Sequence, residues 1–295
     1  MRDSGEDSLV TDLARAADKL SNASEKNFVN PFEFIKWPER HDPGQWYFSP
    51  ELISLYATSF YQTLDETARK ELSFYECVNF FSLNIHGEKS LVADIAGRLH
   101  VQENPAISRY LHHFLDEENK HMIYFAGFCE RYAGKVYPEK KLEFPRDYAP
   151  GEKEFLFYAR VYIFEEIVDA YNARMARDER LAEVARQINR IHHEEEARHL
   201  AFGRKMLAHL LEMHRPDWDT ATLEGIRDYL AAYLDSIWRE YYNPAVYRDC
   251  GFDNAYQLYE TAWNHTENRA HRQSVSEKCT RYFASLGVID ESLLT

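Results

Sequence analysis

Two histidines of this chain are each preceded by a glutamate three residues upstream, a spacing that puts both side chains on one face of an α-helix. The pairs are Glu118-x-x-His121 and Glu196-x-x-His199. Carboxylates and imidazoles without thiolates suit iron or manganese better than copper or zinc. Chance alone would supply roughly one such pair at this composition, so the motif by itself is weak evidence for a metal site. The positions of the two pairs within the predicted helices are more informative.

Long helices must position these residues, because only 11 glycines and 10 prolines interrupt the 295 residues. Apolar residues recur at spacings of three and four, and no alternating strand pattern occurs, so the fold class is all-α. The pattern predicts three shorter C-terminal helices after four long ones. The long helices are expected at about 66–100, 105–133, 152–176 and 180–213, and the shorter ones lie within about 220–286.

Each Glu-x-x-His pair falls in one of the long helices, the second and the fourth. Bundles that bind two iron or manganese ions combine two such pairs with a single glutamate from each of the other two helices. Glu88 interrupts an apolar stripe in the first helix, and Glu165 does the same in the third. A buried carboxylate is costly unless it is paired or bound to metal. The sequence therefore predicts a ferritin-like four-helix core with a dinuclear metal site.

His192 adds a third imidazole to this pattern. It lies four residues before Glu196 and seven before His199, so the three share one helical face. Two alternatives stay open: a position outside the ligand set for His192, and Glu76 in place of Glu88. The predicted metal ligands are Glu88, Glu118, His121, Glu165, His192, Glu196 and His199.

Acidic residues beside the ligands are expected to have supporting roles. Glu117 and Glu166 are each one residue from a ligand and point about 100° away from it. Asp169 or Glu195 could orient an imidazole N–H group, as carboxylates do at metal sites. A solvated surface position is the alternative for Glu195.

The ends of the chain differ from its centre. Residues 1–27 are polar and expected to be mobile, whereas 28–295 are expected to form a single ferritin-like domain that contains the dinuclear site. Prolines and aromatic residues between Asn30 and Pro50 indicate an extended N-terminal arm. Ser49-Pro50-Glu51 has the residue types of a helix start. The C-terminal helices are expected to cap the bundle.

Composition excludes several classes of protein. The 35 basic and 49 acidic residues give a net charge of −14, which disfavours nucleic-acid binding. No apolar run approaches the ~20 residues of a membrane helix, and no signal peptide is evident. The four cysteines are widely spread and read as free thiols, so a cytoplasmic location is expected.

The ligand motifs resemble those of the p-aminobenzoate N-oxygenases, ferritin-like di-iron enzymes of natural-product pathways. The resemblance covers about residues 50–270, and the extra imidazole of His192 is characteristic of that family. The motifs that carry it are Glu118-Asn119-Lys120-His121, Phe164-Glu165-Glu166-Ile167 and His192-His193-Glu194-Glu195-Glu196-Ala197-Arg198-His199.

The resemblance implies a homodimeric monooxygenase with two iron ions (Fe²⁺/Fe³⁺) and dioxygen as co-substrate. A peroxo-diferric species would convert an arylamine of a small biosynthetic intermediate to hydroxylamine, nitroso or nitro products. An external electron donor, such as a separate reductase, is expected because no flavin or nicotinamide motif is visible. The alternatives are C–H hydroxylation, desaturation or radical generation at the same cluster, and iron storage, which the long chain with its arm and cap disfavours.

The substrate is expected to lie between the cluster and the C-terminal helices. Aromatic residues near the ligands could line an apolar pocket, and C-terminal arginines could bind a substrate carboxylate. Core packing for the aromatic residues and surface positions for the arginines are the alternatives. The candidates are Tyr158, Tyr162, Phe202, Arg269 and Arg272.

Overall fold

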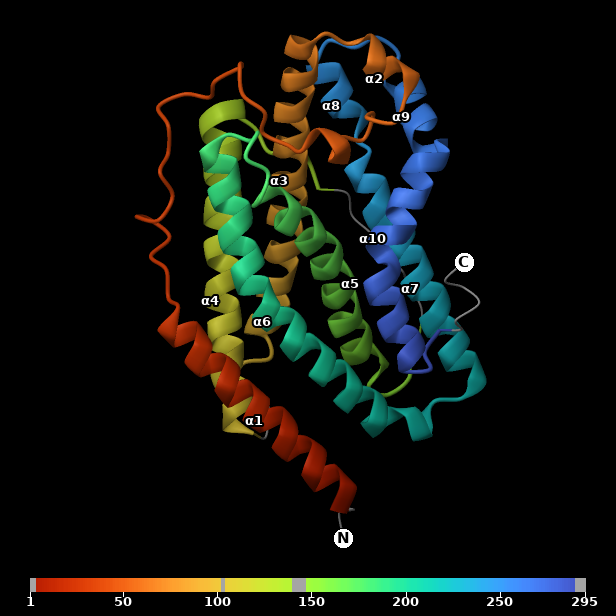
Figure 1. Cartoon of the computed structure of the whole chain (residues 1–295). Helices are drawn as coiled ribbons and strands as arrows, with labels where there is room; N and C mark the ends of the chain where they lie inside the picture. The colour runs from red at the N-terminus through yellow and green to blue at the C-terminus, as the bar shows by residue number, and fades with distance from the viewer. Residues whose placement is uncertain (1–3, 102–103, 140–146, 290–295) are drawn as a thin grey trace.

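Four long helices lie side by side and form the core of the fold (Figure 1). The computed structural model describes residues 4–101, 104–139 and 147–289. Across these ranges the regular elements are helical, and the only β-type pairing is an isolated bridge between Trp46 and Leu181. The all-α, ferritin-like expectation is thereby confirmed. The four core helices are α3 (Glu66–Ala96), α4 (Pro105–Phe128), α5 (Glu152–Met175) and α6 (Glu183–His214).

Local sequence sets the ends of these helices. The side chains of Asp65 and Asn104 accept hydrogen bonds from backbone N–H groups in the first turns of α3 and α4. A single π-helical turn, η2 (Cys129–Ala133), extends α4 and stops at Gly134, whose φ of 63° favours glycine. The expected boundaries of all four helices are therefore close to those observed.

One glycine permits the close approach of α3 and α5. A Cβ atom on Gly87 would lie less than 3.0 Å from the ring of Phe164. Gly87 precedes Glu88 and Phe164 precedes Glu165, so this contact lies directly beside two of the predicted ligands. The packing of an aromatic ring onto a bare backbone sets the spacing of the helices at that level.

Residues Ser4–Lys26 form the helix α1, an element that the sequence analysis did not predict. Figure 1 shows α1 crossing the lower end of α4, and α1 packs against both α4 and α6. Leu13, Ala17, Ser21 and Ser24 are its buried residues. Because three of them are small or polar, composition alone did not reveal a packing face.

The arm between α1 and α3 is largely irregular, as expected. Ser49 does not start a long helix, because its hydroxyl donates a hydrogen bond to Asp178 instead of capping the backbone. Only a 3₁₀ turn, η1 (Pro50–Leu52), and the short helix α2 (Ser59–Thr63) form there.

The C-terminal part contains four helices rather than the three expected. His265 adopts an extended backbone with ψ of 134° and divides the last one. A 3₁₀ turn, η3 (Arg215–Asp217), precedes them, and α7 and α10 pack against α5 while α8 packs against α3. The four are α7 (Thr220–Tyr241), α8 (Pro244–Asp249), α9 (Ala255–Asn264) and α10 (Thr266–Ser285).

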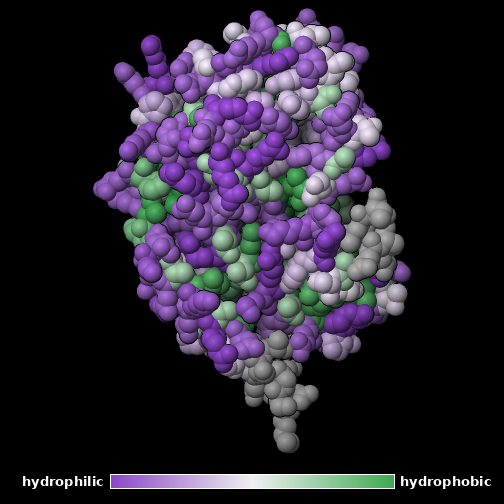
Figure 2. All heavy atoms as spheres, in the orientation of Figure 1, coloured by the Kyte–Doolittle hydropathy of each residue, from purple (hydrophilic) through white to green (hydrophobic). Residues whose placement is uncertain are grey.

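The face of the molecule in Figure 2 is mostly hydrophilic, with scattered hydrophobic residues. No helix within the described ranges is both long and apolar enough to cross a bilayer. All four cysteines are free thiols, as the sequence predicted, and three of them are buried.

Candidate metal centre

The seven predicted ligands converge in the middle of the four-helix core. One comes from α3, two from α4, one from α5 and three from α6. Each is 2% exposed or less, although all seven are polar or charged. The seven-residue cluster consists of Glu88, Glu118, His121, Glu165, His192, Glu196 and His199.

Glu196 lies at the centre of the cluster. Its Oε1 atom is 2.9 Å from Nδ1 of His199, 3.5 Å from Nδ1 of His121 and 3.5 Å from Nε2 of His192. Glu118 Oε1 lies 2.8 Å from the same nitrogen of His199. Donors from three helices thus face one small volume.

Overlapping sets of these residues are close enough to share metal ions. In each set the potential ligand atoms all lie within 4.8 Å of one another. His121, His192 and Glu196 each belong to two sets, so the three sets overlap in one cluster. The sets are Glu88 with His121 and His192, Glu118 with His121 and Glu196, and Glu165 with His192 and Glu196.

The chemistry of the buried atoms fits cations. Seven polar atoms of the cluster lack a hydrogen-bond partner among the described residues, and buried polar atoms are rarely left so. Two divalent cations would carry four positive charges against the four negative charges of the carboxylates, so the filled site would be neutral and could remain buried. The seven atoms without a hydrogen-bond partner are Glu88 Oε2, Glu118 Oε1 and Oε2, His121 Nδ1, Glu165 Oε1 and Oε2, and Glu196 Oε2.

The pKa values of the cluster show how unfavourable its charges are without cations. Burial, reinforced by the neighbouring carboxylates, raises the pKa of Glu88 and of Glu165 well above the ordinary value. Burial lowers the pKa of His192 well below its usual range, so this imidazole is neutral and can donate a lone pair. Without metal ions the carboxyl groups of Glu88 and Glu165 therefore retain protons, which bound cations would replace as the balancing charge.

A different side chain holds the outward nitrogen of each imidazole. His121 Nε2 is 2.9 Å from Glu195, and His199 Nε2 is 2.8 Å from Glu117. His192 Nδ1 contacts the side-chain amide of Asn172. These partners fix each ring so that its other nitrogen faces the cluster.

The structure shows which of the acidic residues considered in the sequence analysis contacts an imidazole of the cluster. Glu195 is buried and orients His121, so its solvated alternative is wrong. Asp169 contacts His193, which is not part of the cluster. Glu166 pairs with Arg204 and Lys278 instead of an imidazole.

The supporting carboxylates are themselves neutralised. Arg198 lies 2.6 Å from Glu117 and 3.7 Å from Glu195. Lys120, only 2% exposed, lies 3.3 Å from Glu195. These two cations balance the two carboxylates, so the charge of the cluster can be balanced by metal ions alone.

Glu76 does not belong to the cluster, although it lies on the same helix as Glu88. Its carboxyl group accepts hydrogen bonds from the backbone N–H, at 3.1 Å, and the hydroxyl of Ser54. The hydroxyl of Ser54 also lies 2.8 Å from that of Tyr247. Geometry therefore favours Glu88 over Glu76 as the ligand candidate on α3.

The predicted aromatic residues are all buried, but they lie at different distances from the cluster. Phe202 packs against Phe114, whose ring stacks on His199 with centroids 4.1 Å apart. Tyr158 packs against Phe202. Tyr162 instead contacts Tyr282 of α10, and its hydroxyl accepts a hydrogen bond from Arg204.

The two predicted arginines are not placed in the cluster. Arg269 is exposed on α10. The guanidinium of Arg272 stacks on Trp263 at 4.0 Å and donates hydrogen bonds to Tyr242 and to the backbone of Trp263. Its donors therefore hold the C-terminal helices together.

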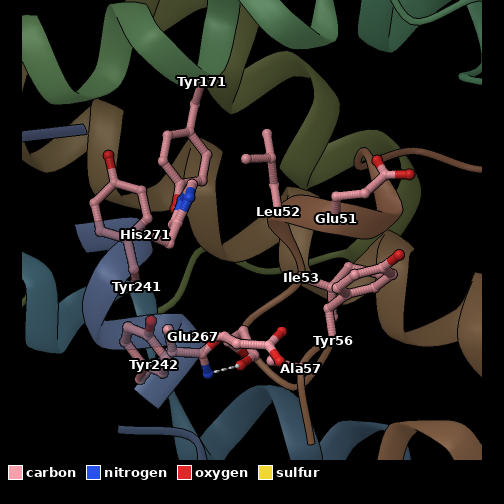
Figure 3. A pocket seen from close by; sticks show the side chains of 12 residues that line it. Glu51, Leu52, Ile53, Tyr56, Ala57, Tyr171, Tyr241, Tyr242, Glu267 and His271 are labelled. Carbon is pink, nitrogen blue, oxygen red and sulfur yellow. Dashed lines mark hydrogen bonds between the residues drawn. The ribbon is translucent and has the colours of Figure 1, made fainter. Parts of the chain in front are cut away.

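A cavity of about 180 Å³ opens among η1, α7 and α10 (Figure 3). Tyr171, Tyr241 and Tyr242 form one side of it, and His271 accepts or donates a hydrogen bond with the Tyr171 hydroxyl at 3.0 Å. None of the seven cluster residues lines this cavity. Tyr171 directly precedes Asn172, the partner of His192, in the sequence of α5.

A second, smaller cavity of about 70 Å³ does reach the cluster, because Glu165 lines it. Gly87 and Phe164 lie on its wall, together with Arg160 of α5 and Tyr233 of α7. Sequence reasoning missed Asn172, Arg160 and Tyr233. Neither Asn172 nor Tyr233 has a spacing motif, and the placement of all three depends on which helices meet.

Comparisons with known proteins point the same way as the ligand motifs. The family model described as P-aminobenzoate N-oxygenase AurF matches residues 10–287. No curated protein matches the chain. One similar solved structure is an R2-like ligand-binding oxidase with an aerobically reconstituted metal cofactor after photoconversion (15% identity, 90% of this chain, 91% of that chain, TM-score 0.44). Another is a mutant R2-like ligand-binding oxidase with an anaerobically reconstituted Mn/Fe cofactor (16% identity, 90% and 91%, TM-score 0.41).

Proposed function

The chain belongs to the p-aminobenzoate N-oxygenase family, and we propose that it oxygenates the nitrogen of a small arylamine with two iron ions and dioxygen. The family makes it a non-haem metal oxygenase. The observation that carries the proposal is the buried set of four carboxylates and three imidazoles, whose unpaired atoms fit two cations. The expected products are the hydroxylamine and, after further oxidation, the nitroso and nitro compounds.

The roles of the protein residues follow from their positions. When bound, the two iron ions would supply the reduction of dioxygen to an oxidant that can attack an amine nitrogen. The four carboxylates would hold the ions and balance their charge, and the three imidazoles would complete the ligand sets. Glu117, Glu195 and Asn172 fix the imidazole rings.

Aromatic side chains keep water away from the imidazoles. Phe114 stacks on His199, and the ring of Phe125 lies 5.1 Å from that of His192. Both phenylalanines are 1% exposed or less. A dry surrounding strengthens the electrostatic interactions of the ligands and protects an oxidant from side reactions.

The overall balance requires electrons from outside the chain. Amine, dioxygen, two electrons and two protons give hydroxylamine and water. We propose that a separate reductase or small donor supplies these electrons. A homodimer and a place in natural-product biosynthesis likewise remain predictions from the family resemblance, and a cytoplasmic location remains a prediction from the four free cysteines.

Product analysis tests the proposed reaction. Iron-loaded protein, a chemical reductant and ¹⁸O₂ are mixed with a panel of aromatic and aliphatic amines, and products are identified by mass spectrometry. Incorporation of ¹⁸O at nitrogen of an arylamine supports the proposal. Oxygen on carbon, or a new double bond, would assign the cluster to hydroxylation or desaturation instead.

A further inference from the structure

Two cavities that share three lining residues lie on the side of the bundle where Glu165 is placed. The inner cavity, of about 70 Å³, is bounded by α3, α5 and α7 and includes Glu165 in its lining. The outer cavity, of about 320 Å³, lies at the same helices. Both are lined by Asp94, Phe157 and Arg160, so these three side chains stand where the cavities meet. The cavity in Figure 3 has no such link to the seven-residue cluster.

The outer cavity has a charge opposite to that of the chain. Three cationic side chains, Arg98, Lys153 and Arg160, are among its described lining residues, against a single acid, Asp94. The whole chain carries a net charge of −14. A concave site with a local positive charge on an acidic protein attracts and orients anions.

Aromatic side chains share this lining. Phe157 lies at the junction, and the guanidinium of Arg98 stands 3.8 Å from the centroid of its ring. Tyr148 and Tyr229 also line the outer cavity. Its volume is that of an ordinary small-molecule site, where apolar walls hold a ring and a few polar groups fix its orientation.

Arg160 is the cationic side chain best placed to bind a ligand where the two cavities meet. Its Nε atom is buried and has no hydrogen-bond partner among the described residues. Among the described residues, its only ion pair is a loose contact with Asp94, at 3.9 Å. Arg98, by contrast, donates a hydrogen bond of 2.8 Å to the backbone oxygen of Asp94. Arg160 therefore keeps donors available for a bidentate contact with an anion.

Arg160 and Glu165 are five residues apart on α5, a rise of about 7.5 Å along the helix. We infer that the substrate reaches the cluster between α3, α5 and α7, and that Arg160 binds an anionic group on it. The amine then points into the inner cavity at Glu165 while the ring lies against Phe157. This inference rests on the proposed function, since it concerns the amine oxidised there.

Ligand binding to the metal-free protein tests the inference without turnover. Calorimetry measures Kd for 4-aminobenzoate, 4-aminophenyl phosphate and the uncharged 4-aminobenzamide. Wild-type protein should bind at least one anion about 10–100-fold more tightly than the amide, and Arg160→Leu should remove that preference. The two anions distinguish a carboxylate from a phosphate as the group recognised. Arg160→Lys should retain part of the preference for an anion over the amide, because a charge remains but the bidentate geometry is lost.

Arg186→Leu is the matched control. Arg186 is similarly exposed (28% against 34%), has a loose ion pair with Glu183 at 3.6 Å and also has an unpaired buried Nε. It lines neither cavity. An equal loss of anion binding in both variants, or no preference for an anion in the wild type, including no binding at all, would overturn the inference. Selective binding without N-oxygenation would uphold it and contradict only the proposed reaction.

With the iron-loaded enzyme, Arg160→Leu should raise KM for an anionic arylamine by a similar factor and leave kcat within a few fold. KM for a neutral arylamine should not change. A fall in kcat alone for both substrates would mean that Arg160 acts on the cluster rather than on the substrate.

Discussion

His192 Nε2 lies 3.1 Å from Glu88 Oε1, so a side chain of α6 meets one of α3 at the edge of the cluster. These were the two ligands for which the sequence left alternatives open. Each is fully buried, and each belongs to the same set of potential metal ligands as His121. Their contact joins α6, which carries three of the predicted ligands, to α3, which carries one.

Replacement of His192 tests whether this third imidazole is part of the working site. We expect His192→Ala to lower turnover by at least about 10–100-fold while the far-UV circular dichroism spectrum stays unchanged, because a ligand nitrogen is lost from the cluster. His193→Ala is the control, since His193 is 31% exposed and contacts Asp169 outside the cluster. Turnover of the His192 variant at the wild-type rate would exclude it from the ligand set.

Asn172 should matter for metal affinity although it is not a ligand. Asn172→Leu keeps the shape of the side chain but removes the polar partner of His192 Nδ1. We expect the affinity for one of two ions to fall by about 10–100-fold in a competition with a chelator. Asn189→Leu removes another fully buried asparagine, whose amide bonds only to the backbone of Ala185, and should leave the affinity unchanged. Equal affinities in both variants would argue against this role.

The buried carboxyl group of Glu76 should make stability depend on pH. Burial raises its pKa to about 7, against about 4.5 for an exposed glutamate. The folded protein then holds the proton more tightly than the unfolded chain, so this stabilisation is complete below about pH 4.5 and is lost as pH rises through 7. The loss amounts to about 3 kcal/mol. Urea unfolding at several pH values, in one metal state, should show a smaller decline for Glu76→Gln than for the wild type; parallel curves would contradict it.

The close packing at Gly87 should be sensitive to a single methyl group. In Gly87→Ala the new Cβ would overlap the ring of Phe164, and we expect a destabilisation of about 1–3 kcal/mol. Gly203→Ala is the control, because a Cβ there meets no atom within 4 Å and alanine favours the helix by up to about 1 kcal/mol. Thermal unfolding distinguishes them, and equal melting temperatures of the two variants would show that α3 and α5 can separate without cost.

The sequence predicted the long helices and the seven clustered residues because both depend on local periodicity. A predicted ligand such as Glu165 is visible as a charge in an apolar stripe, and α3 and α4 begin at the ordinary capping residues Asp65 and Asn104. The structure places the seven side chains in one volume, which periodicity alone could only suggest.

Features that depend on contacts between distant segments were not predictable. The helix α1 was missed because its packing face consists of small residues such as Ala17 and Ser21. The hydroxyl of Ser49 donates a hydrogen bond to Asp178, 129 residues away, so Ser49 precedes only the 3₁₀ turn η1 and does not cap it through its side chain. Arg272 was expected near a substrate, but two aromatic neighbours from α7 and α9 hold it elsewhere.

The measurement that tests the account most directly is the metal content of the purified protein and of two matched variants, after loading with iron. The wild type should hold about two irons per chain. Glu76→Gln should hold the same number, whereas Glu88→Gln, on the same helix, should lose iron from the cluster. One tightly held zinc in the wild type, or equal iron in all three proteins, would contradict the assignment of the buried cluster as a di-iron centre.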